Sequence, residues 1–143
     1  MYKRQPKAAT EDAICLSLGL LSLHKREYSL TIDQLLNHNF SKPLQILKSK
    51  TILLRAYFEQ FLLDNSYYEL LMAQTHSFEK FVRRNGFISK SQKEIYLNFI
   101  LFTRKIANAI LQKSISTELL EKIKNTKFIL LKSWLLKKVE SEL

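Results

Sequence analysis

Ser66 to Phe87, SYYELLMAQTHSFEKFVRRNGF, is the stretch that decides the expected fold, because it carries the signals of one complete helix. Ser66 and Glu69 have the spacing of a capping box, in which a hydroxyl and a carboxylate each accept a hydrogen bond from a free backbone N–H. At the other end, Gly86 suits the left-handed conformation that ends many helices, with Phe87 then contacting Val82. Between these ends, the apolar residues repeat as one buried helix face: Tyr67, Leu71, Phe78 and Val82.

The composition favours a helical domain. Two Gly and two Pro in 143 residues leave little turn material, and 46% of the residues are hydrophobic against 25% that are charged. These are the proportions of a folded globular chain, and a chain of this length can bury one core. We therefore expect an all-α fold and a single domain that covers residues 6–143.

Five further helices are expected to stack on the central one, giving about six helices in three antiparallel hairpins. Three helices precede it at residues 10–23, 28–37 and 43–63, with Thr10 and Pro43 at the first and third starts. The fifth begins at Ser89 or Ser91. The sixth, capped by Ser116 or Thr117, is expected to run unbroken to the chain end over roughly 35–40 Å. The stack is expected to form the end of a right-handed α-solenoid, with the last helix partly as a cap.

Apolar residues that recur at helical spacing are expected to form the core. They are Ile32, Leu35 and Leu36 in the second helix; Leu44, Leu47, Leu54, Phe58 and Phe61 in the third; Ile95, Phe99, Phe102, Ile106 and Ile110 in the fifth; and Leu120, Ile123, Leu130, Leu131, Trp134, Leu135 and Val139 in the sixth.

The first helix is apolar almost all round, which predicts neighbours on both of its sides. Without a neighbour on one side, part of its apolar surface would lie open as a patch and favour self-association. The leucines considered for that patch are Leu16, Leu18, Leu20, Leu21 and Leu23.

The first five residues, MYKRQ, resemble the translation of a transposon end used in shotgun sequencing libraries. We therefore expect residues 1–5 to be a sequencing adapter, and residues 6–143 to be the C-terminal fragment of a longer protein. The net charge is +10, and +8 without Lys3 and Arg4. Residues 85–143 hold eleven Lys and Arg against five Asp and Glu, so +6 of that charge lies in this half.

No pattern of catalytic or ligand-binding residues is evident, so we expect no enzyme activity, no cofactor and no metal. The single Cys15 excludes an intrachain disulfide, and it is expected to be a small buried hydrophobe. The three histidines fall in different segments, and only His76 has a carboxylate, Glu79, one turn away. With two glycines in all, the chain has no phosphate-binding loop. It also has no apolar run of the ~18 residues that cross a membrane, and we expect a cytoplasmic protein.

The first helix pair resembles a tetratricopeptide repeat. Leu18-Gly19 matches the Leu-Gly of the first helix, Leu35 matches a large apolar position of the second, and Pro43 matches the terminal Pro. The repeat is degenerate, because other positions depart from the pattern: Cys15 replaces an aromatic, Ser22 a Tyr and Thr31 an Ala. The resemblance implies a helical-repeat scaffold that binds other proteins.

A second resemblance covers about two-thirds of the chain. AYFEQFL at 56–62, FEKFVRRNG at 78–86 and KEIYLNFILFTR at 93–104 look like the C-terminal part of long, uncharacterised bacterial helical-repeat proteins. This similarity implies a helical fold and assigns no chemistry.

The leading functional hypothesis is a non-enzymatic scaffold that binds a protein or peptide. Stacked helix pairs make a concave surface that receives a peptide or helix. Tyr and Gln side chains are suited to the rim of such a groove. The candidate groove residues are Tyr57, Gln60, Tyr68 and Gln74.

The alternative hypothesis is binding of nucleic acid or another anionic surface through the basic C-terminal half. The candidate anion patch is Lys80, Arg83, Arg84, Lys90 and Lys93. Two observations disfavour it. No known nucleic-acid-binding motif is present, and cations at the end of a helix are stabilised by the helix dipole without any ligand.

Overall fold

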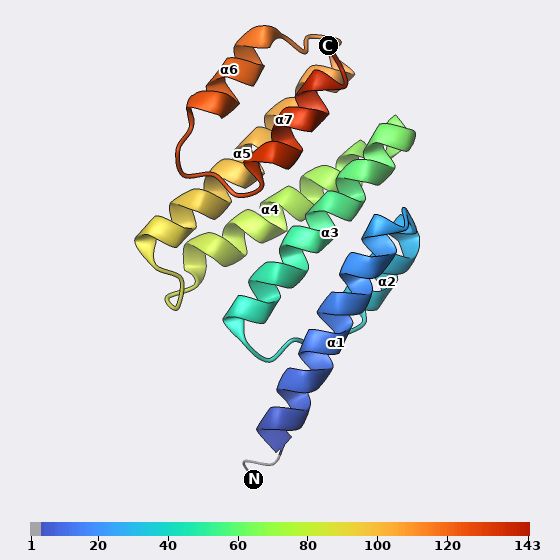
Figure 1. Cartoon of the computed structure of the whole chain (residues 1–143), viewed down its shortest axis with the longest axis vertical. Helices are drawn as coiled ribbons and strands as arrows, with labels where there is room; N and C mark the ends of the chain where they lie inside the picture. The colour runs from blue at the N-terminus through green and yellow to red at the C-terminus, as the bar shows by residue number, and fades with distance from the viewer. Residues whose placement is uncertain (1–3) are drawn as a thin grey trace. The chain divides into compact units, whose positions relative to one another are not determined.

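The structure, a computed structural model, describes the backbone of residues 4–143 and the side chains from Thr10 onward. In this part of the chain all regular elements are helical, so the predicted all-α class is confirmed (Figure 1). There are seven α-helices and one short 3-10 helix rather than about six. They are α1 (Arg4–His24), α2 (Tyr28–Leu36), α3 (Pro43–Leu63), η1 (Asn65–Tyr67), α4 (Tyr68–Arg84), α5 (Lys90–Leu111), α6 (Thr117–Asn125) and α7 (Lys132–Glu140). Residues 1–3 of the predicted adapter lie outside the described residues.

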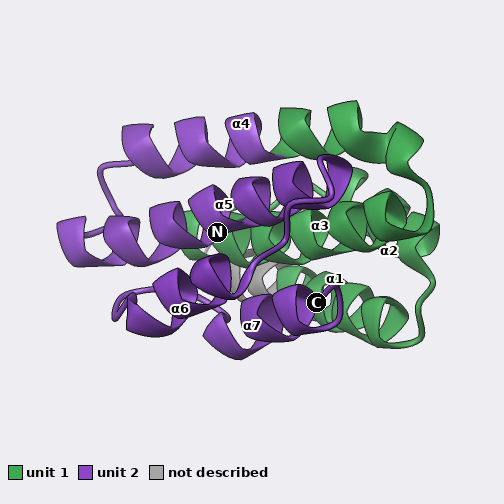
Figure 2. Ribbon diagram, turned by 90° about the horizontal axis from the view of Figure 1, so that it is seen from above, with its two compact units in different colours: residues 1–74 green, residues 75–143 purple. Residues whose placement is uncertain are grey.

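The chain divides into two compact units, residues 1–74 and 75–143, and the division falls inside α4 (Figure 2). The first unit holds α1, α2, α3, η1 and the first turns of α4. The second holds the rest of α4 with α5, α6 and α7. None of the helices in residues 4–143 is long and apolar enough to cross a lipid bilayer.

In the first unit, α1 and α2 form a hairpin and α3 packs against both. The closest approach is at Gly19, where a Cβ atom would lie 3.1 Å from the Leu35 side chain. Ser22 and Thr31, two of the departures from the tetratricopeptide pattern, share a hydrogen bond of 2.7 Å between their hydroxyls. Both residues are buried, so this bond supports the hairpin beside the Gly19 contact. The apolar core of the hairpin and α3 is formed by Leu16, Leu23, Ile32, Leu35, Leu47, Leu54, Phe58 and Phe61.

Three expectations for this unit are wrong. Thr10 does not start α1, which already begins at Arg4, because Pro6 falls in the first turn, where its missing N–H is tolerated. Leu36 is exposed, since it is the last residue of α2 and is turned 100° from the buried Leu35. Leu44 is also exposed, at the second position of α3.

The predicted capping box at Ser66 is not the start of the central helix. Asp64 caps the start of η1 instead, and its carboxylate accepts a hydrogen bond of 3.0 Å from the backbone N–H of Ser66. Ser66 therefore lies inside η1, and α4 begins two residues later. Asp64, two residues upstream, competes with Glu69 for the Ser66 N–H, which the spacing of Ser66 and Glu69 does not reveal. The predicted buried face is confirmed for Leu71, Phe78 and Val82, whereas Tyr67 is only half-buried.

The expected ending of the central helix is wrong as well. Gly86 has no positive φ. The Asn85 side chain closes the turn by accepting a hydrogen bond of 2.9 Å from the backbone N–H of Phe87, an alternative that Asn offers to a glycine ending. Phe87 is 87% exposed and does not fulfil the expected packing on Val82; Ile88 is buried in its place.

In the second unit, α5 packs along the last turns of α4. The predicted capping box of Ser89 and Gln92 is present at the start of α5. Arg104 on α5 reaches α4 and donates to the Thr75 hydroxyl at 2.9 Å and to the Glu79 carboxylate at 2.6 Å. Aromatic contacts extend this core, since Phe78 packs against Tyr96 and Phe99 against Trp134.

The predicted last helix is broken into α6 and α7, each of nine residues. The segment between them is held against α5, where the Asn98 amide donates to the Phe128 carbonyl at 2.8 Å and the Leu130 N–H donates to the Ile95 carbonyl. Leu131 adopts a left-handed φ of 54° before α7. The break lets α6 fold back on α7, so that Ile123, Leu135 and Val139 are all fully buried. The predicted Ser116 cap is present.

The close approach at Gly19 predicts that substituting Gly19 destabilises the fold far more than substituting Gly86. Gly19→Leu is expected to lower the free energy of unfolding by about 2 kcal/mol or more, because the new side chain overpacks the Leu35 contact. Gly86→Leu is the control, since Gly86 has open space around its Cβ position and no positive φ, and it should change stability by ~0.5 kcal/mol or less. Urea unfolding monitored by circular dichroism measures both, and equal effects would contradict the assignment.

Candidate functional site

The side of α1 that faces away from α2 and α3 carries a shallow, open apolar groove of about 520 Å³, lined by residues of α1 alone. We call this surface the outer face of α1. It is lined by Thr10, Ala13, Ile14, Ser17, Leu18 and Leu21.

The outer face exists because α1 uses its opposite side for the core. Leu16, Gly19 and Leu23 are buried there, so two of the five leucines considered for the open patch, Leu16 and Leu23, are not part of it. Leu18, Leu20 and Leu21 are exposed as expected. On the outer face itself, the large side chains keep about half of their surface free: Ile14 54%, Leu18 46% and Leu21 50%. None of the six residues that line the groove is charged.

The predicted groove residues do not come together at one opening. Tyr57 is buried rather than open, and its hydroxyl is hydrogen-bonded to the Gln74 side chain. Burial raises the pKa of Tyr57, and the bond with Gln74 offsets part of that increase. Tyr68 packs against Phe61, with ring centroids 6.0 Å apart. The buried Tyr57 is thus hydrogen-bonded to Gln74, which is only half-buried.

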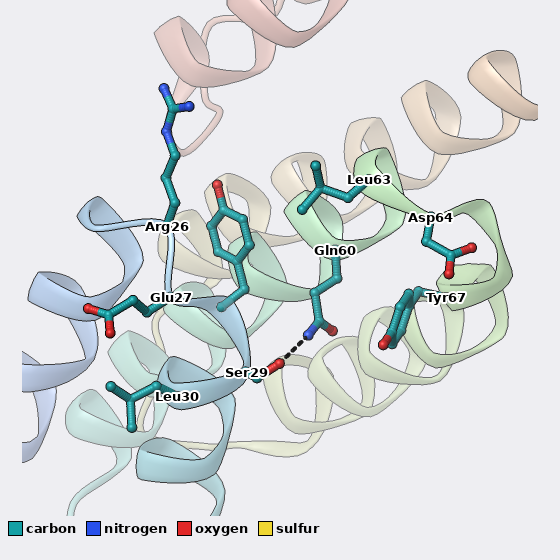
Figure 3. A pocket seen from close by; sticks show the side chains of 9 residues that line it. Arg26, Glu27, Ser29, Leu30, Gln60, Leu63, Asp64 and Tyr67 are labelled. Atoms are coloured by element: carbon teal, nitrogen blue, oxygen red, sulfur yellow. Dashed lines mark hydrogen bonds between the residues drawn. The ribbon is translucent and has the colours of Figure 1, made fainter.

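Gln60 lies at a different opening, a pocket of about 400 Å³ between the α1–α2 turn and the end of α3. Its amide donates to the Ser29 hydroxyl at 3.1 Å, which bridges α3 and α2 (Figure 3). Figure 3 also shows Asp64 and Tyr67 across the pocket from Glu27. The pocket mixes one arginine, Arg26, with two carboxylates, and it gathers no set of groups arranged for chemistry.

The predicted anion patch is partly used for structure. Arg83 pairs with Glu79 at 2.8 Å, and the Lys93 ammonium donates to the Arg83 carbonyl at the end of α4. Lys80 and Arg84 remain together, one turn apart, in a shallow pocket of about 280 Å³ with Phe81 and Asn85. Lys90 is exposed at the start of α5. The patch therefore offers fewer free cations than its composition suggests.

A buried polar cluster that the sequence did not reveal joins α1 to the α2–α3 connection. Asp12 is only 2% exposed, and its carboxylate lies 2.6 Å from the His38 Nε2. The Ser41 hydroxyl donates to the other carboxylate oxygen at 3.0 Å. Burial alone would raise the pKa of Asp12, but the hydrogen bonds from His38 and Ser41 outweigh it and the pKa is lowered. Since the ionised carboxylate only accepts, His38 Nε2 is the donor. Asp12 and His38 are 26 residues apart in the sequence, so no pattern of neighbouring residues predicts that they pair.

The remaining candidate groups have structural surroundings. Glu79, the partner considered for His76, binds Arg83 and Arg104, and hydrogen bonds from these two arginines lower its pKa. Cys15 is half-buried, and burial raises the pKa of its thiol. Among the described side chains, no three His, Cys, Asp or Glu residues lie close enough to hold a metal ion.

Comparisons with known proteins returned no match: no family model, no curated protein and no solved structure is similar to the chain.

The Asp12 cluster predicts a large cost on removal. Asp12→Ala is expected to lower the free energy of unfolding by about 2–3 kcal/mol, because hydrogen bonds to a buried charge are lost. The exposed neighbour Glu11 provides the control, since Glu11→Ala should change the free energy of unfolding by ~0.5 kcal/mol or less.

The lowered pKa of Asp12 sets the pH dependence of this effect. The carboxylate stabilises the fold at pH values above its ordinary pKa of 3.8, and this stabilisation is lost as the pH falls through the lower pKa of the folded state. Urea unfolding measures the difference in the free energy of unfolding between the parent chain and Asp12→Ala. This difference should be constant at pH values above 3.8 and should shrink as the pH falls further. A difference that grows on acidification would contradict the assignment.

Proposed function

We propose that the chain is a non-enzymatic interaction module that binds a helix of a protein partner along the outer face of α1. One observation carries the proposal: three half-exposed large apolar side chains line an open groove without a charged residue. Contiguous exposed apolar surface of this kind marks protein interaction sites. The apolar stripe of another helix can pack against such a face, because the side-chain rows of one helix fit the shallow grooves between the rows of the other.

The arrangement of the first unit supports this proposal. The α1–α2 hairpin packs on α3, as in arrays of helix pairs, and its Gly19–Leu35 contact uses the residues that resemble a tetratricopeptide repeat. In such arrays each pair has a neighbour on both sides. The outer face of α1 is the side on which a further helix would continue the stack.

A synthetic amphipathic helix tests the proposal. The peptide has Leu and Ala on one side and Glu and Lys on the other, over about five turns or 18 residues. When it is titrated into the ¹⁵N-labelled chain, amide shifts are expected to change at residues 10–21. Leu18→Lys should weaken binding about tenfold or more, because it places a charge in the apolar contact.

A matched control keeps this test specific. Leu70→Lys changes a leucine of similar exposure, 52%, on α4, and it should leave peptide binding unaltered. Shift changes elsewhere on the chain, or equal losses in the two variants, would refute a binding site on α1.

A second candidate function is supported by the pair of Lys80 and Arg84, which share one pocket on α4. Two cations one turn apart can contact neighbouring phosphates, so weak binding of an anionic polymer is proposed for this position. Lys80→Glu with Arg84→Glu should abolish binding of a labelled DNA duplex, and the parent chain should lose affinity with a log–log salt slope of about −0.9 per phosphate contact. Charge reversal at Lys122 and Lys127, on α6 and just beyond it, is the control. Equal affinity in all variants would exclude the site.

A further inference from the structure

The outer face of α1 has a regular order of small and large residues along its middle. At 100° per residue, four of its six residues lie within about 30° of the centre line. In chain order they are Thr10, Ile14, Ser17 and Leu21, so a small residue alternates with a large one. Ala13 and Leu18 lie on the two opposite edges.

This order is self-complementary when two α1 helices run antiparallel. A two-fold axis between the levels of Cys15 and Leu16 brings Thr10 level with the Leu21 of a second copy, and Ile14 level with its Ser17. By symmetry, Ser17 lies level with the Ile14 of the second copy, and Leu21 lies level with its Thr10. Every one of the four levels then holds one large and one small side chain, the combination that lets facing layers interdigitate at even density.

The parallel arrangement lacks this match. It would put Ile14 against Ile14 and Ser17 against Ser17, so crowded levels would alternate with under-filled ones, and under-filled apolar contacts lose dispersion energy.

We propose that the outer face of α1 binds the same face of a second copy of the chain, with the two α1 helices antiparallel. This inference rests on the proposed function and names the partner of that site. The contact is isologous, because each copy contributes the same residues around a two-fold axis.

The size of the face sets the expected affinity. Residues 10–21 span roughly 18 Å of helix, and one helix pair of that length buries less than the ~1,200 Å² of standard complexes. Interfaces of this size are typical of weak, transient contacts, and we expect a dissociation constant between about 10 µM and 1 mM.

Charge gives the dimer a distinctive salt dependence. The outer face is uncharged, whereas the whole chain carries +10, so two copies repel each other at low ionic strength. Salt screens this repulsion. Dimerisation should strengthen as salt is added, the opposite of binding to a nucleic acid.

Sedimentation equilibrium measures the association. The parent chain is expected to dimerise in the range given above, and Ile14→Lys should weaken the dimer about tenfold or more, because a charge would be desolvated at the contact. Leu70→Lys is the control and should dimerise like the parent. A monomer at millimolar concentration, or an equal loss in both variants, would overturn the proposal.

Disulfide trapping determines the direction of the helices. Thr10→Cys and Leu21→Cys are made separately in a Cys15→Ser background and then mixed under mild oxidation. In the antiparallel dimer the two new cysteines face each other, while identical positions lie about 16 Å apart along the helices. Mass spectrometry should therefore find the mixed disulfide and no disulfide-linked dimer in either variant alone. Self-linked Thr10→Cys would overturn the antiparallel arrangement, and the absence of any link would overturn the contact.

The two tests separate this inference from the proposed function. If the chain is monomeric while the synthetic helix still perturbs residues 10–21, the second-copy inference fails and the interaction site stands. If neither association involves α1, both fail.

Discussion

The contact between Gly19 and Leu35 determines which side of α1 faces the core. With no side chain at Gly19, the α2 leucine lies directly against the α1 backbone. Polar bonds then hold the hairpin on both sides of that point: Asp12 binds His38 and Ser41 toward one end of α1, and Ser22 binds Thr31 toward the other. These bonds add to the orientation set by the Gly19 contact, because a hydrogen bond weakens when its groups are misaligned.

The orientation that these contacts impose explains the exposed surface of α1. The helix is apolar almost all round, so any orientation would bury some leucines and leave others in water. The actual one buries Leu16 and Leu23 and exposes Leu18 and Leu21. The exposed side is therefore a consequence of which residues approach α2 most closely, and the same contacts set the position of its row of small and large side chains.

The sequence allowed prediction of features that depend on neighbouring residues, such as the helical class, the Ser89 cap of α5 and the buried Phe78 and Val82. It failed where another group competes. Asp64 accepts the hydrogen bond from the Ser66 N–H that the Glu69 carboxylate was expected to accept, and the Asn85 side chain closes the turn assigned to Gly86. The exposed leucines of the candidate site were partly foreseen. The buried pair of Asp12 and His38 was not, because only the α1–α2 hairpin brings them together.

The break between α6 and α7 has a consequence for the order in which the chain acquires its structure. Residues 117–140 favour one continuous helix by local preference, and the bend depends on the Asn98 amide, 30 residues before its acceptor Phe128. Because synthesis runs from the N-terminus, α5 is made and emerges from the ribosome before this segment. The part that must fold against its own local preference is thus made last, after the α5 groups that hold its bend.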